Sequence, residues 1–287
     1  MAGIRPRRSL IPTRAQVSLV LLGLLGPVVV SGCGLFGSTA QTRTGTPRAT
    51  TTTTTTTVSY GPPTGPFKDR APAVVIGDML AAADQSGPAI YNLSQEGGNT
   101  SPWAWSGVAG RNGGTQSFAG DMQTTIGPGR AVQQVIVTGR RVYFNANNYA
   151  LLGLDEAVGS ANSVAPLAGH WISVSRSSGR IYELLSYAAT LPDLLAQAVP
   201  TAPLKRVGFA VVNGQQVVEI GGGVPEVAGT QTSGTCVVAI ALVGAPLPVQ
   251  TQCVEENGVV TVTIDFDAWR APLSATPPLH STPWRVP

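Results

Sequence analysis

The sequence predicts an α+β fold in which one strongly bent antiparallel sheet carries helices on one of its faces. The first observation is composition: of 287 residues, 34 are glycine and 23 are proline, and only 11% are charged, which is typical of a mostly β chain rich in turns. The second is a series of short segments with apolar residues at alternate positions, separated by tight turns that require antiparallel pairing. The third is two stretches with helical spacing. The order helix, strands, helices, strands therefore favours one sheet covered by helices.

The first 32 residues have the parts of an export signal. Four arginines and no acidic residue precede the apolar run at residues 17–30, and small residues follow it. The tetrad at residues 30–33, "VSGC", resembles the bacterial lipobox, in which the cysteine thiol receives a diacylglyceryl group and becomes the mature N-terminus. An uncleaved transmembrane anchor is the alternative, because fairly apolar residues continue to Phe36. We expect residues 1–32 to be a signal peptide and Cys33 to be the lipid attachment site, because a lone cysteine at this junction has no other evident purpose.

Either alternative places the rest of the chain outside the cytoplasmic membrane. The expected location is the extracytoplasmic face of a bacterial cell membrane, with a lipid as the anchor. Residues 33–65 include eight consecutive threonines between Pro- and Gly-containing flanks, a composition that cannot form a core. This segment is expected to be a lipidated tether, and residues 66–287 to form one domain, a length that suits a sizeable core.

Charge and the missing motifs exclude several classes of function. Without the signal segment, fourteen basic residues face fifteen acidic ones, so there is no basic face for a nucleic acid. Two histidines, His170 and His280, are present, and the sequence has no G-x-S-x-G, S-x-x-K or H-E-x-x-H motif and no clustered His/Cys ligands. We therefore expect neither catalysis nor a metal or cofactor.

Two stretches have the spacing of amphipathic helices. Residues 71–84 place Val75, Ile76, Met79, Leu80 and Ala83 at helical intervals. Residues 179–199 show a second helical pattern that restarts at Pro192, a residue suited to a first turn. A Gly/Ser/Asn-rich stretch with Trp103 and Trp105 follows the first helix and shows neither period.

The strand pattern begins at Ser117. Segments of alternating character lie at residues 117–126, 132–138, 141–147 and 170–175, and the turn at residues 139–140 pairs residues 135–138 with residues 141–144. After the second helical stretch, Asn213-Gly214 is a strong two-residue hairpin turn within residues 206–220. Further strands are expected at residues 235–243, 247–254 and 259–266.

Cys236 and Cys253 are the two cysteines that remain after the lipobox. A cysteine pair in an exported chain is expected to bond. If the turn between their strands centres on residues 243–246, the two thiols face each other across a hairpin. Two buried free thiols are the alternative, and the sequence favours the disulfide.

Four short segments occur in an order that resembles the LppX/LprA/LprF/LprG lipoproteins of mycobacteria and their relatives. They are "VTGRRVYFNAN" at residues 137–147, "LAGHWISVS" at 167–175, "LVGAPLPVQTQ" at 242–252 and "VTIDFDAWRAPLSATPP" at 262–278. The resemblance covers residues 117–278. Leu273 and Ala275 stand where the family pattern has valines, and the cysteine pair is not part of that pattern. The resemblance implies a half-barrel of antiparallel sheet, akin to the LolA/LolB-like carriers, with helices closing its concave face and acyl chains held between the two layers.

The alternation within the strands places apolar side chains on one face of the sheet. The candidate lining residues of a lipid cavity are Phe118, Met122, Ile126, Val142, Phe144, Ile172, Val174, Val238, Ile240, Leu242, Val262 and Ile264. A packed core under the helices is the alternative for the same side chains. Aromatic residues make up only 6% of the chain, and small aliphatic side chains on a curved sheet favour space for acyl chains. Burial of an acyl chain releases about 0.8 kcal/mol per methylene, so its binding needs no fixed charge.

The sequence thus predicts a non-enzymatic envelope lipoprotein that binds or carries acyl lipids or glycolipids between sheet and helices. The expected partners are this lipid, the membrane through Cys33, and an envelope transporter or another protein. The alternative is an envelope lipoprotein that acts as a protein-interaction or signalling module. In that case Trp103 and Trp105 are the better candidates for an exposed recognition surface.

Overall fold

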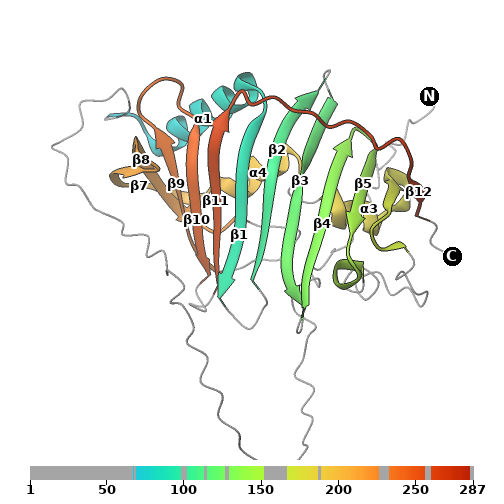
Figure 1. Ribbon diagram of the computed structural model, residues 1–287. Helices are drawn as coiled ribbons and strands as arrows, with labels where there is room; N and C mark the ends of the chain where they lie inside the picture. Colours follow the sequence, from blue (N-terminus) through green and yellow to red (C-terminus); the bar gives the residue numbers. More distant parts are fainter. Residues whose placement is uncertain are drawn as a thin grey trace, which may run out of the picture.

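Twelve strands among the described residues form one open, curved sheet, and helices cover one of its faces (Figure 1). The structure is a computed structural model that describes residues 67, 69–97, 102–112, 115–126, 129–151, 167–186, 189–225, 233–255 and 260–284. The predicted signal segment and tether, with Cys33, lie outside these residues. We call the two sides of the sheet the helix-covered face and the outer face.

The sheet is antiparallel except at one edge. Its order is β12-β6-β5-β4-β3-β2-β1-β11-β10-β9-β8-β7. The strands are β1 (Ala89–Gly97), β2 (Trp103–Asn112), β3 (Thr115–Ile126), β4 (Gly129–Thr138), β5 (Arg141–Ala146), β6 (Trp171–Ser175), β7 (Thr201–Val212), β8 (Gln215–Gly223), β9 (Gly234–Ala241), β10 (Pro248–Glu255), β11 (Val260–Trp269) and β12 (Thr282–Pro283). Only β12 and β6 pair in parallel. The predicted fold class, a curved antiparallel sheet with helices on one face, is confirmed.

The predicted hairpins have the expected register. Val135 lies opposite Phe144 across the β4–β5 turn. The β7–β8 turn places Asn213 at φ 50° and Gly214 at φ 76°, which is the conformation that makes Asn-Gly a favoured two-residue turn. Cys236 of β9 lies directly opposite Cys253 of β10, and the two form the predicted disulfide.

Strands β1 and β2 occupy the stretch in which the sequence shows no alternation. Gly107 of β2 pairs with Gly120 of β3, and the ring of Phe118 lies across both. A Cβ atom built on Gly107 or on Gly120 would approach a ring carbon of Phe118 to 2.5 Å. The glycines are therefore needed for this close approach, although isolated glycines in a strand pattern lower its β propensity.

The helices are α1 (Pro72–Ser86), α3 (Arg180–Ser186) and α4 (Leu191–Ala198), with a short 3₁₀ turn, η3 (Arg176–Ser178), before α3. The hydroxyl of Thr190 accepts a hydrogen bond from the Asp193 amide at the start of α4, and Pro192 lies in the first turn, as predicted. In α1, the predicted residues Val75, Ile76, Met79 and Ala83 are buried. Leu80 differs from the prediction: it lies at the margin of the apolar stripe, and 37% of it is exposed.

The buried side chains of the helix-covered face fall into two clusters. The main cluster lies under α3 and α4, over strands β1 to β6 and β11. The α1 cluster joins Val75, Ile76 and Met79 of α1 to Val218, Ile220, Val238 and Ile240 of β8 and β9. Ala83, one turn after Met79, belongs to the main cluster. Helix α1 therefore contacts both.

A small third cluster lies on the outer face at the β7 end of the sheet. It contains Val217, Ala239, Ala241 and Val249. The Asn213 side-chain amide donates to the Asp265 carboxylate at 3.3 Å, which brings the tip of the β7–β8 hairpin to β11, three strands away from β8 in the sheet. The hairpin thus curls over the outer face, and this explains why apolar side chains there are buried.

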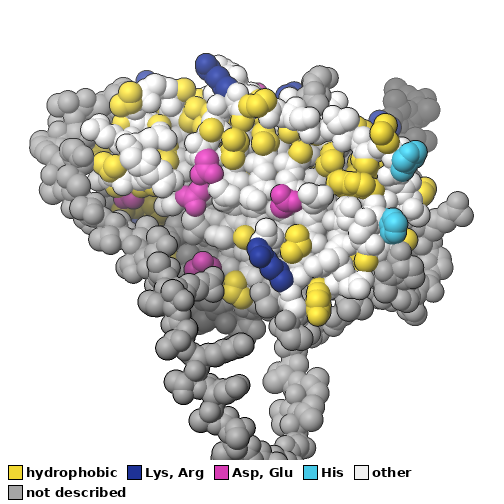
Figure 2. All heavy atoms as spheres, in the orientation of Figure 1, with side chains coloured by type: hydrophobic (Ala, Val, Ile, Leu, Met, Phe, Trp, Pro, Cys, Tyr) yellow, Lys and Arg dark blue, Asp and Glu magenta, His cyan; other side chains and the backbone are white. Residues whose placement is uncertain are grey.

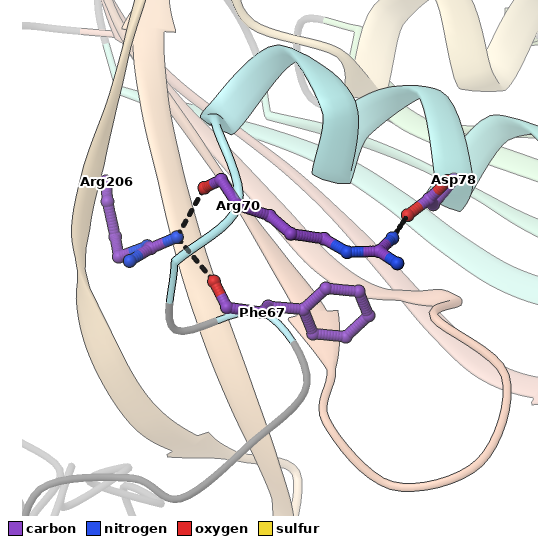
Figure 3. Close-up of polar contacts among 4 residues, drawn as sticks. All are labelled: Phe67, Arg70, Asp78 and Arg206. Carbon is purple, nitrogen blue, oxygen red and sulfur yellow. Dashed lines mark hydrogen bonds and ion pairs between the residues drawn. The ribbon is translucent and has the colours of Figure 1, made fainter.

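Arg206 of β7 fixes the chain that leads into α1 (Figure 3). Its guanidinium donates to the carbonyl oxygens of Phe67 at 2.5 Å and Arg70 at 2.7 Å. Arg70 in turn forms an ion pair with Asp78 of α1, and the Phe67 side chain is buried in the α1 cluster. We call this set of contacts the Arg206 clamp. It holds the start of α1 against an edge strand of the sheet.

Candidate functional site

The side chains predicted to line a cavity lie on the helix-covered face. The main cluster contains Phe118, Val142, Phe144, Ile172, Val174 and Ile264, with Met122 and Val262 packed against it as half-buried residues. The α1 cluster contains Val238 and Ile240, with Leu242 packed against it. The side chain of Ile126 lies outside the described part of the chain. The strand register explains this grouping, because residues paired across neighbouring strands point to the same face.

Strand β10 forms a seam between the two clusters. Its residues on the helix-covered face are Thr251 and Cys253, which lie opposite Val238 and Cys236 of β9 and opposite Ile264 and Val262 of β11. Neither Thr251 nor the disulfide belongs to either apolar cluster. Thr251 is fully buried, and its hydroxyl donates to the carbonyl of Ala198 at the end of α4 at 3.0 Å. A polar contact and a disulfide, with no large aliphatic side chain, thus separate the two apolar halves.

Small domains more often have one contiguous apolar core than two. Helix α1 crosses this boundary: Val75 and Met79 pack in the α1 cluster over β8 and β9, whereas Ala83 belongs to the main cluster. Asp84, the residue after Ala83, forms an ion pair with Arg111 of β2, on the other side of β10. The apolar interior thus changes from one cluster to the other at β10, and α1 together with Val199, which follows α4, bridges the change.

Several polar atoms lie inside the main cluster. Gln133 of β4 is only 7% exposed; its amide nitrogen donates to the Met122 sulfur at 2.9 Å, while its carbonyl oxygen is buried without a hydrogen-bond partner. The indole nitrogen of Trp103 is buried in the same way. A buried polar atom without a partner costs about 1–3 kcal/mol. The sequence gives no signal for this feature, since Gln133 occurs in an otherwise ordinary alternating strand.

Tyr91 and Trp105 form an aromatic centre with Phe118. The ring centroids of Tyr91 and Trp105 lie 5.9 Å and 5.6 Å from that of Phe118. Burial raises the pKa of Tyr91 well above its usual value, and a hydrogen bond with Trp105 acts in the opposite direction. Both residues come from β1 and β2, the strands that the alternation pattern did not identify. They are the part of the face that sequence reasoning missed.

Trp103 and Trp105 do not form the exposed surface that the alternative interpretation requires. Trp105 is only 4% exposed, and Trp103 and Trp284 are half-buried and packed against the main cluster. Trp284 also lies 6.2 Å from Phe144 between ring centroids. The expectation that Trp103 and Trp105 present a recognition surface is therefore wrong, because the sheet register turns both side chains toward the helices.

The described residues hold no group of three or more His, Cys, Asp or Glu side chains that could bind a metal ion. His170 and His280 are both exposed. Within the same described ranges, none of the helices is both long enough and apolar enough to cross a membrane. The chemistry available on the helix-covered face is thus apolar contact with a few isolated hydrogen-bonding atoms.

Comparison with known proteins gives distant structural similarities. No protein-family model matches the sequence, and no curated protein matches it. Among solved structures, LprF from Mycobacterium bovis is 14% identical, with 72% of this chain and 96% of LprF covered and a TM-score of 0.49. Lipoprotein LppX from Mycobacterium tuberculosis is 16% identical, with 72% of this chain and all of LppX covered and a TM-score of 0.47. A LolA superfamily protein from Nitrosomonas europaea is 7% identical over 69% of this chain and 94% of its own, with a TM-score of 0.27.

LprF and LppX belong to the group of lipoproteins that the sequence motifs resemble. At these TM-scores the fold assignment rests on the strand order and helices of this chain itself.

Proposed function

We propose that this protein is an envelope lipoprotein that binds the acyl chains of a lipid or glycolipid between the sheet and its helices. The observation that carries the proposal is the division of the helix-covered face into two apolar clusters with the seam at β10 between them. Separation of α1 from α4 along this seam would expose Val238, Ile240 and Ile264 to a guest. An acyl chain in that space would replace contacts between the two halves with contacts to itself.

The energetics of such binding need no charged partner. Each methylene removed from water contributes about 0.8 kcal/mol, so one long chain can offset the cost of parting the two halves. The face supplies mainly Val, Ile, Leu and Phe side chains, and the ion pair that joins α1 to the sheet, Asp84 with Arg111 of β2, is exposed to solvent. The oxygen of Gln133 and the indole nitrogen of Trp103 offer hydrogen bonds to a hydroxyl or an ester of the same ligand.

The proposal includes the N-terminal anchor. Residues 1–32 would be removed, Cys33 would carry the lipid, residues 33–65 would tether the domain of residues 66–287, and the protein would stand on the extracytoplasmic face of the membrane. A Cys33→Ala variant is then expected to lose incorporation of labelled fatty acid. Unchanged labelling would contradict the assignment of Cys33.

The binding proposal is tested by native mass spectrometry of protein expressed in a lipid-rich bacterium. We expect wild-type protein to carry added masses of acyl lipids. In Val238→Trp the larger ring takes space beside the seam, and overpacking of about 1–3 kcal/mol should reduce the loaded fraction about fivefold or more. Gln252→Trp is the matched control, because Gln252 is the exposed neighbour of Thr251 on the outer face of β10.

Thermal unfolding of each variant separates loss of binding from loss of fold. Ile264→Trp, on the other side of the seam, provides a second folded variant with the same expected loss. A lipid-free wild-type protein, or equal loading of Val238→Trp and Gln252→Trp in their folded forms, would overturn the proposal.

A further inference from the structure

A continuous row of polar side chains crosses the outer face of the sheet, away from the helices. The register pairs Ser106 of β2 with Asp121 of β3, Asp121 with Gln134 of β4, and Gln134 with Asn145 of β5. Asn145 in turn lies opposite Trp171 of β6. Figure 2 shows this outer face: its middle is mostly polar side chain and backbone, with acidic side chains among them. A row of this kind is not required for folding, because the outer face needs only to be soluble.

The row is hollowed where it crosses β3, β4 and β5. A cavity of about 530 Å³, open to solvent, is lined there by Asp121, Gln134, Asn145 and Asn148, with Val132 and Gly169 at its sides. A volume of this size is within the range of small-molecule sites. The carboxylate and the amide side chains thus lie around one shallow, open hollow.

The lining offers hydrogen-bond donors and acceptors that the described part of the chain does not use. The side chains of Asp121 and Gln134 form no hydrogen bond or ion pair with another described residue. Asn145 donates its amide nitrogen to the Gly169 carbonyl at 3.2 Å, so its side-chain oxygen keeps its capacity to accept. The side chain of Asn147, by contrast, already forms hydrogen bonds within the protein. Its amide nitrogen donates to the Arg130 carbonyl, and its oxygen accepts from the Val132 and Ala150 amides.

The charge of the hollow excludes anions. Among the described residues that line it, Asp121 is the one ionisable group and there is no lysine or arginine. Arg130, two residues before Val132, directs its guanidinium to the side chain of Gln123. A phosphate or a polyanion would find no cation in the described lining, and these residues belong to no group of three or more His, Cys, Asp or Glu side chains that could hold a metal ion.

The lining fits a neutral molecule rich in hydroxyl groups. A sugar hydroxyl donates and accepts at once, so it can pair with a carboxylate and an amide side by side. Trp171, the cross-strand neighbour of Asn145 on the same face, is half-buried and belongs to none of the apolar clusters. Tyr143 lies on that face two residues before Asn145. These rings provide flat apolar surfaces beside the polar row, and such surfaces can pack against the C–H faces of a sugar ring.

We infer that the hollow formed by Asp121, Gln134 and Asn145, with Trp171 beside it, binds a neutral carbohydrate. This site lies on the opposite side of the sheet from the proposed lipid-binding face and does not depend on it. The protein would then hold a glycan of neutral sugars on one face, whatever the other face contains.

The test uses the full-length protein on an array of neutral oligosaccharides of glucose, galactose, mannose, arabinose and N-acetylglucosamine, followed by titration calorimetry with the strongest binder. We expect binding to at least one of them, weakened about tenfold in Asp121→Asn, the ratio that corresponds to one lost hydrogen bond to a charged acceptor. Trp171→Ala is expected to weaken binding by a similar factor through loss of ring contact. Gln252→Ala, an exposed amide on β10 of the same face, is the matched control and should bind as wild type.

Thermal unfolding shows that the variants are folded, and Gln134→Ala is a second lining variant at an exposed position, where misfolding is not expected. Absence of binding to every neutral oligosaccharide on the array would overturn the inference. So would binding that Asp121→Asn, Gln134→Ala and Trp171→Ala all leave unchanged.

Discussion

Tyr91 is a buried hydroxyl in a largely apolar interior. It is 0% exposed and lies beside Phe118 and Trp105. Burial favours the neutral phenol, so the pKa of Tyr91 is raised above that of an exposed tyrosine. In the unfolded chain the same group ionises near pH 10. Its contribution to stability is therefore complete below that pH and is lost as the pH rises toward the folded value.

This environment predicts a specific alkaline response. Above pH 10 the wild-type protein should lose up to about 1.4 kcal/mol of unfolding free energy per pH unit through Tyr91, and Tyr91→Phe should lose correspondingly less. At pH 8 the stability of the variant should stay within about 1 kcal/mol of wild type, because the phenol is neutral there and the ring contact with Phe118 is kept. Urea unfolding at pH 8, 10.5 and 11.5 measures both effects.

Tyr143→Phe is the control, because Tyr143 lies half-buried on the outer face. It should keep the wild-type dependence on pH. An identical slope for wild type and Tyr91→Phe above pH 10 would show that Tyr91 does not carry the effect.

At the scale of elements, the pairing of β2 with β3 depends on two glycines and one ring. Gly107 and Gly120 face each other, and the Phe118 ring lies over both. A Cβ atom on Gly120 would also collide with the carbonyl oxygen of Ser106. Backbone cannot move aside as a flexible side chain can, so the pair of strands would have to separate locally.

Gly120→Ala is therefore expected to lower the free energy of unfolding by about 2 kcal/mol or more, as overpacking against backbone does. Gly77→Ala in α1 is the matched control. No atom lies within 4 Å of a Cβ atom built there, so the change should stabilise the protein by about 0.5–1 kcal/mol through helix propensity. Chemical denaturation measures the free energy of unfolding of both variants. Equal changes in the two variants would contradict the role of the Phe118 contact.

The elements also show which parts of the fold can be read from sequence. The hairpins at Gly139 and Gly214 and the register of Cys236 with Cys253 follow from turn residues and alternation, which are local signals. Strands β1 and β2 could not be predicted, because their inward positions combine glycines with tryptophans and an aromatic ring from the next strand covers the gap. The lining residues were grouped on one face because the period of a strand is two.

The seam at β10 is not visible in the sequence. Thr251 looks like an ordinary strand residue, and only the packing of α4 shows that its hydroxyl meets the Ala198 carbonyl. The hollow around Asp121 cannot be predicted from the sequence either, because its lining residues come from three strands and the segments that follow β5 and precede β6. Features made by distant segments need the tertiary arrangement, whereas features made by turns do not.

In the molecule as a whole, the Arg206 clamp joins the N-terminal part of the domain to β7, an edge strand of the sheet. Two carbonyl oxygens of the chain before α1 accept hydrogen bonds from one guanidinium, and hydrogen bonds from charged donors contribute about 1.5–3 kcal/mol. This single side chain thus connects an edge strand to the helix that covers the α1 cluster.

Arg206→Ala is expected to loosen α1 while leaving the main cluster intact. Hydrogen exchange of the α1 amides should become about tenfold faster or more, while the amides of β3 and β4 exchange as in wild type. Lys205→Ala serves as the neighbouring control, since Lys205 is exposed. Uniform acceleration over all elements, or no change in α1, would contradict the role of the clamp.

The segment before α1 is held against β7, and the described chain ends just after β12; these two strands are the opposite edges of the sheet (Figure 1). If the N-terminal segment is fastened to a membrane, any tension along it arrives first at Phe67, Arg70 and the start of α1, and the far edge bears none of it. Tension on the tether would then move α1 away from the sheet, while α3 and α4 remain packed on it. The tension on the tether and the exposure of the interior would in this way both depend on the guanidinium of Arg206.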